Sequence, residues 1–312
     1  MAAGSRPQDD PNPRRLRRGA KQYLKSFLSF KPINVPLVSL LSHLPKAERF
    51  YRLPVKRAEV FCRVEGRTFV MLDPCGCCIA REMFWGQGER VKPEDRTALE
   101  VFFRLARAAD VVLDIGANTG LFSLVAAAAN PAAEIHAFEI LPKAFLALFH
   151  NFCRNNILHR SHCHLRGIGQ AESLLTMPRP RPGDPLSTTC SSLTRFASGV
   201  RVQFLSLDSL ARLLPPARRV LVKIDVEGTE NDIFAQGGEF LARFGPDLVC
   251  EILPGISKVE EIEPVLQGLS YRLFNIQPGG LSEASRLLPH PDYHDWLFTR
   301  KSDEEFNRLS IR

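Results

Sequence analysis

Residues 111–120, VVLDIGANTG, constrain the fold of this chain more than any other stretch. Their first five positions form an apolar run of strand length that is interrupted only by Asp114, which predicts a buried strand. Gly116 and Gly120 then mark a turn, and the apolar residues 121–129 predict a helix. A buried strand that leads through a tight turn into a helix is typical of a parallel sheet covered by helices on both faces.

Strand and helix patterns continue to alternate after this unit. We expect further strands at residues 134–139, 162–168, 219–225 and 247–252, with helices at 142–155 and 229–236. Two closing strands are predicted at 271–276 and 294–300. The alternation predicts an α/β, Rossmann-like, doubly wound and mostly parallel sheet, in which right-handed crossovers place helices on both faces.

The remaining segments are interpreted as additions to a main domain that spans residues 110–302. Residues 1–50 are expected to form a basic, partly disordered tail that leads into a helix. Residues 51–109 are expected to form an N-terminal cap, with a β-hairpin at 59–72 and a helix that begins near Pro93. Residues 303–312 are expected to be a C-terminal tail.

Charge and composition narrow the partners and the location. The chain of 312 residues has a formal net charge of +7, and much of the excess lies in its first 25 residues. A terminal basic run of this kind is usually solvated, so we expect no nucleic-acid partner. No apolar run approaches the roughly 20 residues of a transmembrane helix, and no signal peptide is evident. We therefore expect a cytoplasmic protein without a transmembrane segment, and the sequence leaves its oligomeric state open.

Cysteine and histidine clusters raise the question of a metal site. Cys75, Cys77 and Cys78 lie in the sequence CGCC, and His162 and His164 would share one face of a strand. The cysteines lack a second pair at zinc-ligand spacing, so packing or surface thiols are the favoured interpretation and a structural metal the lesser alternative. No metal ligand is predicted, and eight cysteines in a cytosolic chain are expected to be reduced.

The turn after the first strand restricts the ligand that it can bind. Asn118 occupies the position of the second glycine in a dinucleotide-binding fingerprint, which disfavours an NAD-dependent oxidoreductase. Asp114 places an anion that suits a cationic ligand and repels phosphate, although it could instead cap the following helix. Glu139 ends the next strand, where its carboxylate can accept both hydroxyls of a ribose. A ribose-bearing cofactor with a positive centre, S-adenosylmethionine, fits these features.

Four motifs together resemble the FkbM-like family of class I S-adenosylmethionine-dependent methyltransferases. They are the DIGAN-x-G turn, Phe138-Glu139, LDSL at 207–210 and KIDVEGTE at 223–230, and the similarity covers roughly residues 88–300. The resemblance implies a seven-stranded Rossmann-like sheet with an antiparallel final strand, and S-adenosylmethionine at its C-terminal edge. It also implies O-methylation of a hydroxyl on a small molecule, a sugar or a secondary metabolite.

The resemblance also assigns cofactor-binding positions. It places Glu139 on the ribose and Ile168 in the adenine-side turn, and it places four residues of the first turn around the methionine moiety: Asp114, Gly116, Asn118 and Gly120. The sequence FEILPK departs from the FEPNP pattern of the family just after Glu139. A methyltransferase-like scaffold without catalytic activity remains an alternative to an enzyme.

Acidic residues at two strand ends are the candidate catalytic groups. Asp225, Glu227 and Glu251 should meet at the cofactor edge, because parallel strands end at the same edge. One of them could act as a general base, Asp225 and Glu251 could hold a divalent cation such as Mg²⁺, or the group could pair with Lys223. His136 is interpreted as a packed core residue, and His294 is a minor candidate base. The acceptor pocket should come from the cap and from the loop at 179–192, whose Arg179 and Arg181 could meet an anionic group.

Overall fold

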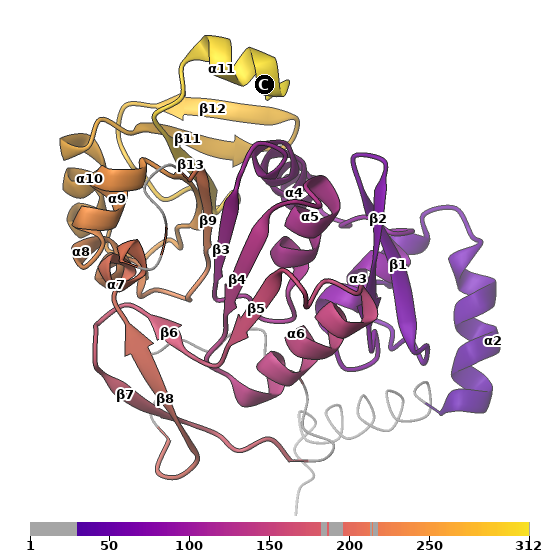
Figure 1. Ribbon diagram of the computed structural model, residues 1–312. Coiled ribbons are helices and arrows are strands. Elements are labelled where there is room, and N and C mark those ends of the chain that lie inside the picture. Colours follow the sequence, from indigo (N-terminus) through magenta and orange to yellow (C-terminus); the bar gives the residue numbers. More distant parts are fainter. Residues whose placement is uncertain (1–29, 182–185, 187–195, 213, 215–217, 312) are drawn as a thin grey trace, which may run out of the picture.

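The computed structural model describes residues 30–181, 186, 196–212, 214 and 218–311 (Figure 1). The basic segment expected to be disordered lies outside these residues. The helix expected to follow it is α2 (Lys31–Ser42), in which Pro32 lies in the first turn and Pro36 lies inside the helix. α2 buries Val38 against Val55 and Trp85 of the cap.

Among the described residues, eight strands form the central sheet in the order β12-β11-β13-β10-β9-β3-β4-β5. The strands are β3 (Val111–Ile115), β4 (Glu134–Phe138), β5 (Ser161–His164), β9 (Val220–Ile224), β10 (Asp247–Glu251), β11 (Arg272–Gln277), β12 (Gly280–Ala284) and β13 (Asp295–Thr299). Strands β10, β9, β3, β4 and β5 are parallel, and β13 is antiparallel to both of its neighbours. The class I methyltransferase fold with an antiparallel final strand is therefore confirmed, and β12 adds an eighth strand beyond the seven expected.

Helices cover both faces of the sheet (Figure 1). Alternating residues of β3 enter two separate cores: Val112 packs with one helical layer, whereas Leu113 and Ile115 pack with the other. The first layer contains α4 (Pro93–Ala106), α5 (Leu121–Ala129) and α6 (Pro142–Arg154). The second contains α7 (Leu207–Ala211), α8 (Glu230–Ala235), α9 (Gly238–Phe244) and α10 (Val259–Gly268). Burial on both faces explains why the central strands are continuous apolar runs in the sequence.

A small second sheet corrects one sequence expectation. The single strand expected at 162–168 is divided into β5 and β6 (Gly167–Ile168), and β6 leaves the central sheet to pair with β8 (Val200–Leu205). β7 (Leu174–Met177) pairs with the other edge of β8. The reason lies at Gly167, because a Cβ atom there would lie 2.2 Å from the ring of Phe204. This close approach fixes β6 against β8.

The cap begins with the expected hairpin, β1 (Glu59–Val64) and β2 (Arg67–Leu72). Its two turn residues, Glu65 and Gly66, both have positive φ angles, as a two-residue hairpin turn requires. The hairpin is followed by α3 (Cys78–Trp85) and α4. Side chains of α6 and of its C-cap bind the free edge of β2, since Asn151 Oδ1 accepts from Leu72 N and the C-cap Asn155 Oδ1 accepts from Val70 N, both at 2.8 Å. The cap and the sheet also share one apolar core.

The segment expected to be a C-terminal tail contains helix α11 (Asp303–Leu309). Ser302 and Glu305 form a capping box at its start, a signal that the sequence contains and that the tail interpretation overlooked. Phe306 packs edge-on against Phe274 of β11, with ring centroids 5.1 Å apart. Among all the described helices, none combines the length and the apolar character that crossing a membrane would require.

Candidate active site

A cavity of about 300 Å³ opens at the C-terminal ends of β3, β4, β9 and β10. The chain runs from β3 toward β5 on one side and then returns to β9 on the other, so the cavity lies at a topological switch point of the sheet. Seven of the predicted site residues line it: Gly116, Asn118, Glu139, Ile168, Asp225, Glu227 and Glu251. Asp114 and Gly120 are described but do not belong to this lining.

The turn after β3 is held tightly against the end of β9. Gly116 has a φ angle of 82°, and a Cβ atom there would lie 1.8 Å from the carbonyl oxygen of Asp225. The backbone N–H of Asp225 also donates to the carbonyl of Ile115 over 2.9 Å. Asn118 adopts a φ angle of 49°, a conformation that asparagine tolerates better than most residues. The glycine is therefore required because two strand ends come into backbone contact.

Asp114 lies behind this turn and caps α5. Its Oδ2 atom accepts from the backbone N–H of Ser123 at 3.0 Å and from the Ser123 hydroxyl at 2.6 Å. Burial raises the pKa of Asp114 to about 6, although the bonds from Ser123 oppose this shift. These contacts agree with the alternative that Asp114 caps the helix after the turn. Direct contact between Asp114 and a cofactor stays a prediction.

Glu139 is fixed by backbone donors from both sides of the cavity. Its Oε2 atom accepts from Asn118 N at 2.7 Å, and its Oε1 atom accepts from Leu141 N at 2.6 Å. Burial raises the pKa of Glu139 to about 7 against the effect of these bonds. Each carboxylate oxygen has a second lone pair, so both can accept another hydrogen bond. The sequence FEILPK departs from the family pattern just after Glu139, but Glu139 still lines the cavity. The differing residues, Ile140 and Leu141, precede α6, which begins at Pro142.

One wall of the cavity is apolar and comes from β4 and the small sheet. Phe138, Leu141 and Ile168 line it together with Phe204 of β8. The ring of His164 stacks on that of Phe138, with centroids 4.5 Å apart. A wall of this kind suits a flat heterocycle.

The opposite wall is charged and centres on a buried lysine. Lys223 has 1% of its side chain exposed, and its Nζ atom lies 2.9 Å from Asp295 Oδ1 and 3.8 Å from Asp225 Oδ2. It also lies over the ring of Phe122, 4.8 Å from the centroid. Burial alone would lower the pKa of Lys223, but the charges of Asp295, Asp225 and Glu251 outweigh it and raise that pKa. The ion pair between Lys223 and Asp225, one of the alternatives considered for the acidic group, is present, and Asp295 is a closer second partner.

Asp225, the more distant partner of this lysine, also belongs to a cluster of three carboxylates. Asp225, Glu227 and Glu251 each offer an oxygen, and these oxygens lie within 4.8 Å of one another. Burial, followed by the charge of Asp225, raises the pKa of Glu251, whose Oε2 atom is buried without a hydrogen-bond partner among the described residues. Burial also raises the pKa of Glu227, to about 6. The oxygens suit a divalent cation, but the cluster already holds the ammonium group of Lys223.

Sequence reasoning missed four charged residues of the lining: Arg90, Asp95, Arg166 and Asp295. Asp295 begins β13, and because β13 is antiparallel to β10, it lies opposite Glu251 at the C-terminal edge of β10. Arg90 and Asp95 come from the cap and form an ion pair of 2.5 Å. The antiparallel direction of the last strand, which the family resemblance implied, was the signal that could have identified Asp295.

The expectation that the cap supplies part of the pocket is confirmed, since Cys78, Ile79 and Ala98 also line the cavity. Most of the loop at 179–192 lies outside the described residues. Arg179 and Arg181 are described but do not line the cavity, and neither does His294, whose Nε2 atom lies 3.3 Å from the carbonyl of Pro291. Cys77 caps α3 by accepting from Ala80 N, so part of the CGCC cluster has the packing role that was favoured.

Comparison with known proteins identifies the family. The model described as the methyltransferase FkbM domain matches residues 114–273, just over half of the chain. The chain belongs to the FkbM methyltransferase family. The resemblance inferred from the DIGAN turn and KIDVEGTE is thereby confirmed, and both motifs lie within the matched residues.

A curated relative within this FkbM family is 31-O-demethyl-FK506 methyltransferase FkbM of Streptomyces tacrolimicus. The two chains are 44% identical over 54 residues, which are 17% of this chain and 21% of that relative. The match thus spans about a fifth of the length of the relative.

Solved structures similar to this FkbM-family chain include two methyltransferases. Precorrin-6y C5,15-methyltransferase of Geobacter metallireducens is 15% identical, with 66% of this chain and 86% of that chain covered and a TM-score of 0.35. An O-methyltransferase of Bacillus cereus in complex with S-adenosylhomocysteine (SAH) is 14% identical, with 67% and 81% covered and a TM-score of 0.37.

Proposed function

We propose that this chain is an S-adenosylmethionine-dependent methyltransferase that methylates a hydroxyl oxygen of a small molecule, a sugar or a secondary metabolite. The observation that carries the proposal is the cavity at the switch point, whose lining brings together Glu139, the Gly116 turn and the acidic cluster. A cytoplasmic location is part of the proposal. It is supported by the seven described cysteines, all of which are free thiols.

The cavity suits a sulfonium nucleoside better than a dinucleotide. In a dinucleotide site, backbone N–H groups of the turn would bind the pyrophosphate. Here the N–H groups of Gly116 and Ala117 donate to the carbonyl of Phe138, and that of Asn118 donates to Glu139. The turn therefore faces a ligand mainly through acceptors and carboxylates, which attract a cation and hydroxyl groups and repel phosphate.

The residues of the chain fit the two ends of S-adenosylmethionine. We assign the ribose hydroxyls to the carboxylate of Glu139 and the adenine to the apolar wall of Phe138 and Ile168. We assign the methionine moiety to the turn at Gly116 and Asn118, which line the cavity, and Asp114 positions that turn by capping α5. When bound, this cofactor supplies an activated methyl group that needs only a correctly placed nucleophile.

The acidic cluster would prepare the acceptor hydroxyl. Glu227 has a pKa near 6, so at neutral pH it is largely ionised and can accept the hydroxyl proton. Glu251, whose pKa is raised, can donate a hydrogen bond to the acceptor. Lys223 forms ion pairs with Asp295 and Asp225. Its ammonium group holds Asp225 in place and offsets part of the negative charge of the acidic cluster. The acceptor would enter beside the cap, whose Cys78 and Ile79 complete the lining.

Cofactor binding tests the proposal directly. Isothermal titration of the full chain should show binding of S-adenosylmethionine and S-adenosylhomocysteine but not of NAD. Glu139→Ala should weaken cofactor binding by about 1.5–3 kcal/mol, roughly ten- to a hundredfold, because it removes charge-assisted hydrogen bonds to the ribose. Glu260→Ala, at an exposed position on α10, serves as the control and should leave the affinity unchanged.

Two results would contradict this assignment. Binding of NAD without binding of S-adenosylmethionine would favour the oxidoreductase alternative, and unchanged affinity of Glu139→Ala would show that the ribose lies elsewhere. Mass spectrometry of a library of glycosides and polyketides incubated with the chain and S-adenosylmethionine then separates an enzyme from a scaffold. A product heavier by one methyl group identifies the acceptor.

A further inference from the structure

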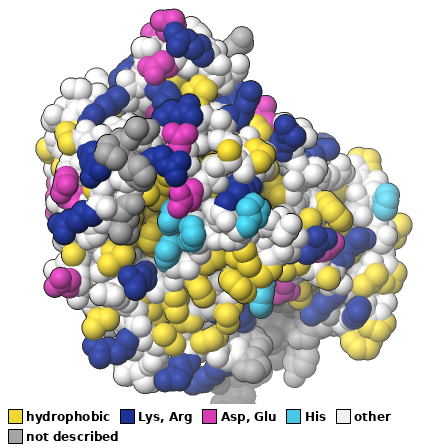
Figure 2. Space-filling model, in the orientation of Figure 1, with side chains coloured by type: hydrophobic (Ala, Val, Ile, Leu, Met, Phe, Trp, Pro, Cys, Tyr) yellow, Lys and Arg dark blue, Asp and Glu magenta, His cyan; other side chains and the backbone are white. Residues whose placement is uncertain are grey.

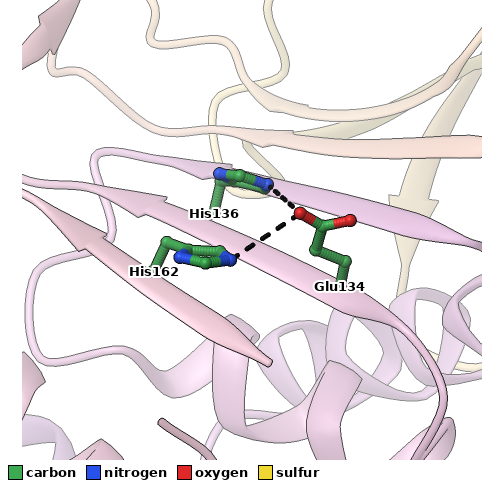
Figure 3. A group of neighbouring side chains, drawn as sticks. All are labelled: Glu134, His136 and His162. Carbon is green, nitrogen blue, oxygen red and sulfur yellow. Dashed lines mark hydrogen bonds and ion pairs between the residues drawn. The ribbon is translucent and has the colours of Figure 1, made fainter. Parts of the chain in front are cut away.

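A second cluster of ionisable side chains lies at the β4–β5 edge of the central sheet, outside the lining of the cavity. Glu134 and His136 are two residues apart on β4 and therefore share a face of the sheet. In the parallel register of the two strands, His136 pairs with His162 of β5. Figure 3 shows the three side chains converging. In Figure 2, histidine side chains reach the surface beside an acidic side chain on this face of the molecule.

The three side chains have the spacing of metal ligands. Glu134 Oε1 lies 3.1 Å from His136 Nε2 and 3.7 Å from His162 Nε2, and all three ligand atoms lie within 4.8 Å of one another. Tetrahedral Zn²⁺ with bonds of about 2.0–2.1 Å separates its ligand atoms by about 3.3 Å, between these two distances. The rings of His136 and His162 lie side by side, with centroids 4.7 Å apart, and both Nε2 atoms are within 4 Å of Glu134 Oε1.

Neighbouring residues hold the first two ligands in position. The Nδ1 atom of His136 lies 3.2 Å from His164 Nε2, which leaves the Nε2 atom of His136 directed at Glu134. Arg218 binds the other oxygen of the glutamate, Oε2, at 3.0 Å and leaves Oε1 for the histidines. Second contacts of this kind orient histidine and carboxylate ligands in known metal sites. The cluster is also accessible, because 50% of the His162 side chain is exposed.

We propose that Glu134, His136 and His162 bind a Zn²⁺ ion, with water in the fourth position. Two imidazoles and one carboxylate match the donor preference of zinc, whereas Mg²⁺ and Ca²⁺ prefer oxygen donors alone. The site is independent of the proposed methyl transfer, since none of its three ligands lines the cavity.

Zinc titration of the full chain, purified without a histidine tag and treated with chelator, tests the site. Wild type should bind one equivalent of Zn²⁺. The Zn²⁺ affinity of Glu134→Gln and that of His162→Gln should each be at least tenfold lower. His150→Gln, which removes an exposed histidine of α6 outside the cluster, should retain the wild-type affinity. His164→Phe keeps a ring on Phe138 but removes the contact to His136, and should weaken binding ten- to a hundredfold.

Cobalt substitution separates this site from the cysteines. Co²⁺ in the wild-type chain should give visible bands of nitrogen and oxygen ligation, and these should disappear in His162→Gln. Equal zinc affinity in wild type, Glu134→Gln and His162→Gln would overturn the proposal, as would cobalt spectra that contain only thiolate charge transfer. S-adenosylmethionine binding and thermal unfolding of each variant confirm that it is folded, so failure of the zinc site is distinct from failure of the proposed activity.

Discussion

Glu227 combines an unusual backbone conformation with an unusual protonation equilibrium. Its φ angle is 58°, and Gly228 follows at 100°. A left-handed conformation at a residue with a side chain costs about 1–2 kcal/mol, so the surrounding structure must hold it. A Cβ atom at Gly228 would lie 2.3 Å from Ile256, which shows how closely the chain packs on this turn. The turn thereby keeps Glu227 at the cavity, where burial raises its pKa.

We predict that Glu227→Gln lowers methyl transfer roughly 10²–10⁴-fold, the usual contribution of a general base. In wild type, kcat/KM should rise as the pH increases through about 6, because the ionised carboxylate is the active form. The variant should lose this rise while it still binds S-adenosylmethionine. A pH profile of both proteins measures the effect, with Glu260→Gln as the control. A variant that keeps the wild-type profile would assign the base to another residue.

The site shows what residue-level reasoning can reach. Asp225 and Glu251 could be placed together from the sequence, because parallel strands end at one edge. The position of Asp114 could not be decided, since the same carboxylate can face a ligand or cap a helix, and only its bonds to Ser123 distinguish the two. Arg90 could not be predicted as a site residue, because nothing in the strand pattern indicates which cap residues line the cavity.

At the level of elements, the contact between the β3–α5 turn and the end of β9 joins the Gly116 turn of the cavity to its acidic cluster. We predict that Gly116→Ala destabilises the chain by about 2–4 kcal/mol, because alanine disfavours the positive φ angle and its Cβ would overlap the carbonyl oxygen of Asp225. Affinity for S-adenosylmethionine should fall as well. Urea unfolding and isothermal titration measure the two effects.

Gly238→Ala is the matched substitution, since a Cβ atom at this helical position would meet no atom within 4 Å. It should change stability by no more than about 1 kcal/mol, in the stabilising direction. If Gly116→Ala were as stable as Gly238→Ala, the two strand ends would not be in the contact described.

Elements differ in how readily the sequence reveals them. The central strands and α5 could be predicted because burial on both faces makes them apolar throughout. The division between β5 and β6 could not, because it depends on Phe204, which packs on Gly167 from a strand more than thirty positions later. The histidines of β4 and β5 were likewise considered separately, and only the register of the two strands brings His136 beside His162.

At the scale of the whole molecule, the buried acidic residues of the site lower the free energy of unfolding at neutral pH. Burial raises the pKa of Asp114 to about 6 and that of Glu139 to about 7, and it also raises the pKa of Glu251. These three carboxyls therefore hold more protons in the folded than in the unfolded state once the pH exceeds the ordinary carboxyl values near 4. By linkage, their contribution to the free energy of unfolding decreases as the pH rises from that point through neutrality.

We predict that Glu251→Gln stabilises the chain at pH 8, by an amount on the order of 1–3 kcal/mol. In wild type, folding at this pH requires proton uptake by a carboxyl that is ionised in the unfolded chain, because burial raises its pKa in the folded state. The difference from wild type should shrink toward zero near pH 4, because the Glu251 carboxyl of wild type is then largely protonated in both the folded and the unfolded chain. Denaturant unfolding at a series of pH values measures it. A constant difference at all pH values would mean that Glu251 is not the titrating group.

The antiparallel β13 gives the charged wall a particular order of assembly. Lys223 leaves the ribosome 72 residues before Asp295, its nearest partner. Until β13 inserts between β10 and β11, the ammonium group lacks that partner and its burial in the sheet is unfavourable. The charged wall of the cavity is therefore complete only after residues 295–299 of β13 have been synthesised and have joined the sheet.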